Sequence, residues 1–161
     1  MRNVEIVLAL IGFSVIVACG KPEFAECASS GVSNLGTEPQ VSHDIQYDLD
    51  KVLPQAKSGD PAAQALAAAL YWHTDPKEAV DWADRAMKSG CIDGIVMLAI
   101  AFREGRGVDK DLERAFQLYL LAAQSGSRAA AGIVSDMYHK GEGIEADIDE
   151  ALYWHGQSRG N

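Results

Sequence analysis

Residues 105–115 read Gly-Arg-Gly-Val-Asp-Lys-Asp-Leu-Glu-Arg-Ala, and 36 positions later residues 141–151 read Gly-Glu-Gly-Ile-Glu-Ala-Asp-Ile-Asp-Glu-Ala. The two copies share both glycines, one aspartate (Asp111 and Asp147) and the final alanine. Ser-Gly pairs recur with a similar period, at 58–59, 89–90 and 125–126. A period of this length indicates stacked supersecondary units, none of which can bury its apolar face alone.

Each unit has the pattern of two antiparallel helices joined by a turn. One face of the first helix in the second unit carries residues at the helical period, namely Gly94, Leu98, Ala99 and Phe102. Small residues at two of these positions let neighbouring helices approach closely. The paired glycines mark the reversal of the chain, because they adopt backbone angles that residues with a Cβ resist.

The first unit also has the pattern of two antiparallel helices, but its turn is shorter. Asp75-Pro76 replaces the glycine turn in the first unit, and Asp60-Pro61 predicts an N-cap followed by a first-turn proline. Residues 45–57 predict one further helix, which would cover the exposed end of the stack with Ile45, Leu49, Val52 and Leu53 on one side. We therefore expect an all-α protein, an α-solenoid of about three antiparallel helix pairs plus an N-terminal capping helix. The repeat domain is expected over residues 44–161, with units at about 59–89, 90–125 and 126–161.

These residues resemble the Sel-one-like repeat (SLR), a relative of the tetratricopeptide repeat. The resemblance covers residues 45–161 and is most specific in the second unit. It implies a scaffold that binds other proteins. Some cysteine-rich relatives have been linked to β-lactam binding or hydrolysis, but their regularly paired cysteines are absent here, so the resemblance does not imply that activity.

If the units stack like tetratricopeptide units, the first helix of each lines the concave face. We call the expected partner-binding residues the first-helix surface: Trp72, His73, Val96, Ile100, Arg103, Glu104, Asp136, His139 and Lys140. A tryptophan and an arginine beside apolar residues suit an interface hot spot. The alternative is that Val96 and Ile100 pack against a neighbouring helix. Two other tryptophans, Trp82 and Trp154, are expected in the core.

The N-terminus has the pattern of an export signal. Arg2 precedes an apolar run over residues 6–17, which is too short to span a bilayer, and small Ala18 precedes Cys19. Ile16-Val17-Ala18-Cys19 resembles the lipobox of bacterial lipoproteins. The resemblance implies a signal peptide at 1–18, lipidation of Cys19 and a flexible tether over 19–43. Gly20 after the cysteine implies sorting to the outer membrane, facing the periplasm. The alternative is an ordinary cleaved signal with a chance cysteine.

Charge and cysteine content narrow the partners further. The 161-residue chain has a formal net charge of −9, which gives it no electrostatic reason to bind nucleic acid or anionic lipid heads. Contact with the membrane is therefore expected through the N-terminal lipid only. The acidity favours a basic partner or simply keeps the protein soluble. Cys27 and Cys91 could form a disulfide, or Cys91 could serve as a small buried helix residue.

The sequence contains no strong catalytic or metal-binding pattern, so we expect no enzyme activity, no metal and no cofactor. The glycine turn follows a helix rather than a strand, which excludes a phosphate-binding loop. We expect a lipid-anchored periplasmic binding module. This chain resembles immunity proteins that carry such repeats on an exported body, which implies neutralisation of a toxic effector such as a phospholipase. The alternative is an envelope adaptor or signalling scaffold for complex assembly.

Overall fold

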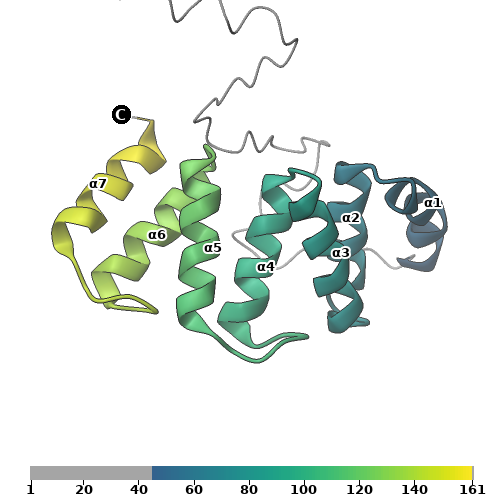
Figure 1. The fold of residues 1–161 in the computed structure, drawn as a ribbon, viewed down its shortest axis with the longest axis horizontal. Helices are drawn as coiled ribbons and strands as arrows, with labels where there is room; N and C mark the ends of the chain where they lie inside the picture. Colours follow the sequence, from purple (N-terminus) through teal and green to yellow (C-terminus); the bar gives the residue numbers. More distant parts are fainter. Residues whose placement is uncertain (1–44, 161) are drawn as a thin grey trace, which may run out of the picture.

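The computed structural model describes residues 45–160, which form seven α-helices without a strand in that range. Figure 1 shows the helices side by side in chain order along an arc from α1 to α7. Three antiparallel pairs, α2–α3, α4–α5 and α6–α7, follow the single helix α1. The all-α solenoid with an N-terminal helix is therefore confirmed. The helices are α1 (Ile45–Lys57), α2 (Pro61–Tyr71), α3 (Pro76–Lys88), α4 (Ile92–Glu104), α5 (Leu112–Gln124), α6 (Arg128–Lys140) and α7 (Ile148–Arg159).

At the start of α2, α3, α5, α6 and α7, a polar side chain accepts a hydrogen bond from a backbone N–H group that has no partner within the helix. The N–H of Ala62 donates to Asp60 Oδ1 at 3.1 Å, and Pro61 occupies the first turn of α2. Asp75, Asp111 and Asp147 cap α3, α5 and α7 in the same way. The cap predicted from Asp60-Pro61 is confirmed, and the repeated aspartate of the two long turns is an N-cap.

The two glycines of each long turn have different tasks. Gly105 and Gly141 end α4 and α6 in the left-handed conformation, with φ of 73° and 68°. Gly107 lies against the previous repeat, because a Cβ placed there would be 2.2 Å from the carbonyl oxygen of Pro76. Gly143 repeats this arrangement, with 2.1 Å to the carbonyl oxygen of Leu112. We call this approach, which links each long turn to the first residue of the preceding second helix, the turn-to-helix contact.

Small residues allow close packing where the sequence predicts it. A Cβ on Gly94 of α4 would lie 2.6 Å from the backbone nitrogen of Met87 and 2.7 Å from Cβ of Ala86, so α4 rests on α3. In α6, Ser135 takes the place of Ala99 of α4, and its hydroxyl donates to the carbonyl oxygen of Ala151 in α7 at 2.7 Å. Much of the buried face of α2 consists of alanine, at positions 63, 65, 67, 68 and 69. We call the contact of α2, α3 and α4 the alanine seam.

Larger side chains fill the rest of the core. Trp82 is 2% exposed and Trp154 is 8% exposed, which confirms that both belong to the core. Leu49 and Ala56 of α1 are buried, and Val52 and Leu53 pack on the same apolar cluster as Trp82. Helix α1 therefore covers the N-terminal end of the stack as predicted. The side chain of Ile45 lies outside what the structure describes.

Replacing Gly143 with alanine is expected to lower the free energy of unfolding by more than the roughly 1–2 kcal/mol that the left-handed conformation alone costs an L-residue. The excess arises because the new Cβ would meet the Leu112 carbonyl, which is backbone and cannot turn aside. Gly141→Ala is the matched control in the same turn, since its φ is 68° but the nearest atom would be 3.5 Å away. Urea unfolding followed by circular dichroism measures both. Equal losses would contradict the turn-to-helix contact.

Candidate functional site

Eight residues of the first-helix surface lie in the C-terminal halves of α4 and α6 or just beyond the end of α2, and Val96 lies in the N-terminal half of α4. The structure does not leave all nine open to a partner. Five side chains are exposed, and the other four are buried or half-buried by neighbouring repeats. The exposed side chains are those of His73, Glu104, Asp136, His139 and Lys140.

Trp72 is part of the core. Its side chain is 4% exposed and packs in the same apolar cluster as Trp82, and the guanidinium carbon of Arg106 lies 5.4 Å from the ring centroid. The expected exposure of Trp72 as a binding anchor is therefore wrong. The physical reason is that the long turn of the next repeat brings Arg106 back to the end of α2, which counting along a single repeat does not reveal.

Val96 and Ile100 pack against helices, as the alternative interpretation proposed. Val96 is 7% exposed and belongs to the apolar cluster built on α4, α5 and α6. Ile100 is half-buried and contacts both this cluster and the one around Trp82. Neither residue forms an open apolar patch, so the expected hot spot at the centre of α4 is not present.

Arg103 is held by an acidic residue of the following repeat. Its Nε and Nη2 donate to the two carboxylate oxygens of Glu142 at 2.9 and 3.0 Å, in a bidentate arrangement. The side chains of Arg103 and Glu142 are 35% and 23% exposed. Hydrogen bonding from Arg103 keeps the pKa of the Glu142 carboxyl below its usual value, against the opposing effect of burial. Arg103 is thus a link between repeats as well as a surface residue.

The first two repeats are joined at the corresponding place. Arg106 stands between the two glycines of the α4–α5 turn, as Glu142 does in the α6–α7 turn. Its Nη1 lies 3.5 Å from Nδ1 of His73 at the end of α2. We call these two links the cross-repeat contacts. Sequence reasoning missed them. The residue between the two glycines changes from arginine in one turn to glutamate in the other, and it faces His73 in the first case and Arg103 in the second. This change of charge is a signal that could have revealed the contacts.

Tyr119 lies beneath Arg103. It is 1% exposed, and burial raises the pKa of its phenol to about 12 although the positive charge of Arg103 acts in the opposite direction. The phenol is therefore neutral at ordinary pH, which suits a structural group better than an acid or base. Among residues 45–160, no group of three or more histidine, cysteine or acidic side chains is placed to hold a metal ion.

Cys91 is fully buried at the start of α4 and is disulfide-bonded. It belongs to a small buried cluster with Ala65 and Ala86. Pairing with Cys27 stays a prediction, because Cys27 lies outside the described residues. Cys19 and the tether over 19–43 lie outside them as well.

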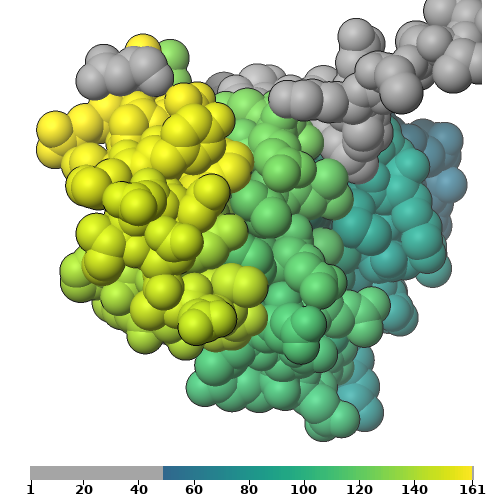
Figure 2. Space-filling view, turned by 60° about the vertical axis from the view of Figure 1, so that its left-hand side comes forward, coloured from purple at the N-terminus to yellow at the C-terminus, as the bar shows by residue number. Residues whose placement is uncertain are grey.

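The third unit has the most open part of the first-helix surface. Asp136 and His139 of α6 line a hollow of about 300 Å³ together with residues of α7. Figure 2 brings α6 and α7, at the C-terminal end of the stack, to the front. The remaining lining residues are Ser135, Ile148, Ala151, Leu152 and His155.

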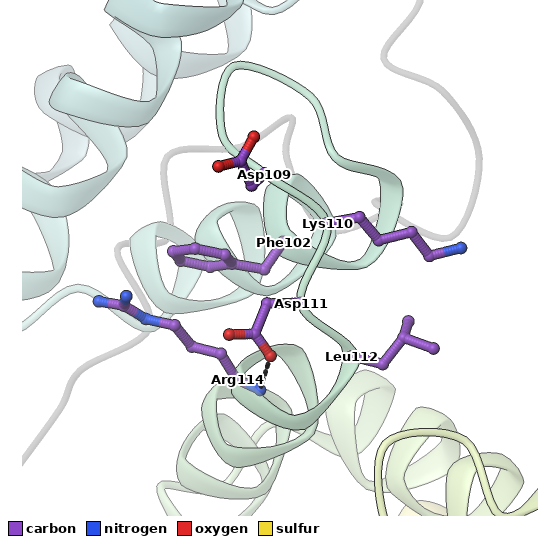
Figure 3. Close-up of a pocket in the computed structure, with 6 residues that line it drawn as sticks. All are labelled: Phe102, Asp109, Lys110, Asp111, Leu112 and Arg114. Carbon is purple, nitrogen blue, oxygen red and sulfur yellow. Dashed lines mark hydrogen bonds between the residues drawn. The ribbon is translucent and has the colours of Figure 1, made fainter.

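A second hollow, of about 740 Å³, lies beside the α4–α5 turn and was not predicted (Figure 3). The guanidinium of Arg114 stacks over the Phe102 ring, 4.4 Å from its centroid. Figure 3 shows Lys110 and Leu112 pointing away from this pair. Asp111 lines the hollow too, and its carboxylate accepts from the backbone N–H of Arg114 at 2.9 Å. This carboxylate is therefore already used as a helix cap.

Comparison with known proteins identifies the repeat. Residues 92–127 and 129–158 match the model of the Sel1 repeat; the first stretch contains α4 and α5, and the second contains α6 and α7 except for one terminal residue of each. No curated protein gives a significant match. Sel1 repeat proteins are generally protein-interaction modules, so the matches support a repeat scaffold of this type.

Solved structures share the fold. A Sel1 repeat protein from Oxalobacter formigenes is 29% identical over 73% of this chain and 48% of its own, with a TM-score of 0.68. A protective antigen present in uropathogenic Escherichia coli strains, displaying an SLR fold, is 28% identical over 81% of this chain and 28% of its own, with a TM-score of 0.69. This chain thus spans about half of the first protein and under a third of the second.

A third structure extends the likeness in fold alone. Helicobacter pylori cysteine rich protein B is 15% identical over 76% of this chain and 92% of its own, with a TM-score of 0.60. The three structures confirm the solenoid of SLR type that the sequence predicts.

The Arg103–Glu142 link is expected to couple the second and third repeats. In a double-mutant cycle with Arg103→Met and Glu142→Gln, we expect a coupling free energy of up to about 1 kcal/mol, as for other partly exposed pairs. Because the folded pKa of Glu142 is lowered, this stabilisation is present above the unfolded pKa of about 4.3 and is lost as pH falls through the folded pKa. Urea unfolding at neutral and acidic pH measures it. Additive losses at neutral pH would contradict the coupling.

Proposed function

We propose that this chain is a non-enzymatic, lipid-anchored protein-binding module of the bacterial envelope. The observation that carries the proposal is the solenoid of Sel1-type repeats, because such repeats generally bind proteins. The exposed members of the first-helix surface, Glu104, Asp136, His139 and Lys140, offer polar contacts at the ends of α4 and α6. Their mixed charges suit recognition of a folded or helical protein surface.

The anchor is proposed from the sequence at Cys19, which lies outside the described residues. Within residues 45–160, none of the helices has the length and apolar character needed to cross a membrane. An outer-membrane lipid at Cys19, with the solenoid in the periplasm, would place the module where proteins arrive from other cells.

The proposed partner is a toxic antibacterial effector, such as a phospholipase, which this chain would neutralise by binding. The net charge of −9 supports a basic partner, because opposite charges steer two proteins together. An inhibitor of this kind needs a stable surface and no chemistry of its own. The solenoid supplies that surface in a small number of repeats.

Substitution of Cys19 by alanine tests the anchor. We expect a slower-migrating precursor that no longer incorporates labelled palmitate, because cleavage of a lipoprotein signal requires the modified cysteine. Gel electrophoresis after metabolic labelling measures both effects, and Cys27→Ala is the matched control, which should leave processing and labelling intact. Unchanged processing and labelling of Cys19→Ala would contradict the proposed anchor.

Protection assays test the immunity role. A susceptible cell that is attacked by a bacterium secreting an antibacterial phospholipase should survive when it carries the exported protein, because binding would occur in the periplasm. The same chain without residues 1–18 should remain in the cytoplasm and give no protection. Survival after contact with the toxin-producing cell is the measurement. Equal protection by both forms would exclude a periplasmic immunity role, and no protection by either would favour the adaptor alternative.

A further inference from the structure

The C-terminal end of the stack exposes an apolar helix face. Ile148 and Leu152 of α7 are 56% and 65% exposed, and their four-residue spacing places them on one side of the helix. They line the same hollow as His155 of α7 and as Asp136 and His139 of α6. We call these five residues the α7 end face. Figure 2 shows α7 in front at this end.

Earlier in the chain, the corresponding residues are covered by a helix. Leu152 and His155 correspond to Phe116 and Tyr119 of α5, which lie 36 positions earlier and are 5% and 1% exposed. Helix α6 packs there, and the rings of Phe116 and Tyr138 meet edge to face with 5.1 Å between centroids. In the last described helix, the α7 end face therefore repeats a helix-binding surface whose copy on α5 is filled by α6.

The contact between α5 and α6 indicates what kind of helix fits. Helix α6 contributes Ala130, Val134 and, at its edge, Tyr138, which follow one another at four-residue steps and pack with Phe116. Ala130 and Val134 are fully buried. An occupant of the α7 end face would thus present two small apolar residues and one aromatic residue on one side of an α-helix.

The charge of the residues near the α7 end face indicates which side chains a bound helix would carry at the edge of its apolar side. The carboxylate of Asp136 lines the hollow of the end face, and Asp149, next to Ile148 in the chain, is exposed. From residue 128 to residue 160 the chain contains six acidic and three basic residues. A second copy of this chain, with the same negative charge, would be repelled, whereas lysine or arginine on the rim of the occupant would be attracted.

We propose that the α7 end face binds a basic amphipathic helix of a partner protein, in the position that α6 takes on α5. The proposal rests on the proposed function as a protein-binding module and assigns the site and the partner class. Binding would bury Leu152 and Ile148 against apolar side chains and bring basic residues near the acidic rim. The interface would continue the stack by one helix.

A synthetic helical peptide tests the site in the full chain. The probe is the sequence of residues 128–140 with Ala129 and Asp136 replaced by lysine, because both positions are exposed in α6. We expect it to bind the wild-type chain and to lose at least about tenfold in affinity for Leu152→Lys, equivalent to about 1.4 kcal/mol. Tyr153→Lys is the matched control, since Tyr153 is 56% exposed but lies on another side of α7. Titration calorimetry and circular dichroism measure affinity and folding.

Several results would overturn the proposal. Absence of peptide binding, or equal binding by Leu152→Lys and wild type, would exclude the site. Equally tight binding of a peptide with glutamate at the two lysine positions would exclude a basic partner. Self-association of the wild type that Leu152→Lys abolishes would make a second copy the occupant.

The protection assay separates this proposal from the proposed function. Full protection by exported Leu152→Lys would show that the toxin binds elsewhere, which would overturn the α7 end face as its site while the immunity role stands. Loss of protection by Leu152→Lys, with protection kept by Tyr153→Lys, is the result that we expect. Failure of the wild type to protect would contradict the immunity role, and the peptide titration would then still decide whether the end face binds a basic helix.

Discussion

The approach of each long turn to the preceding repeat is the constraint on which the stack depends. Gly107 and Gly143 have no side chain at points where a Cβ would overlap the carbonyl oxygens of Pro76 and Leu112. Because both targets are the first residues of second helices, the turn fixes how far one pair stands from the next. This spacing brings the residue between the glycines within reach of the preceding first helix. The Arg103–Glu142 link is therefore a consequence of the missing Cβ.

The sequence was sufficient to predict the helices, the pairs and the capping role of α1, because these depend on patterns within one unit or on its period. It was not sufficient to predict which surface residues are free. Trp72 and Arg103 stand at equivalent offsets, and both are engaged by the next repeat, one by Arg106 and the other by Glu142. Such contacts depend on side chains more than thirty positions away. Counting within a unit could not find them.

These links also divide the candidate surface into two parts. In the first and second units, His73 and Arg103 already interact with a following turn. In the third unit, Asp136 and His139 stay exposed beside a hollow, next to apolar residues of α7. The proposed binding surface thus lies at the C-terminal end of the described helices, where no further described helix packs on α7.

The alanine seam has a consequence for how this protein meets another molecule. Alanine has no side-chain torsion that can select a different rotamer, so the contact of α2, α3 and α4 has few alternative packings. At Gly94, the backbone of α4 lies directly against the backbone of α3. The seam should keep its shape on association, with adaptation limited to surface side chains. The entropy lost on binding would then be small, and recognition would follow lock-and-key complementarity rather than induced fit.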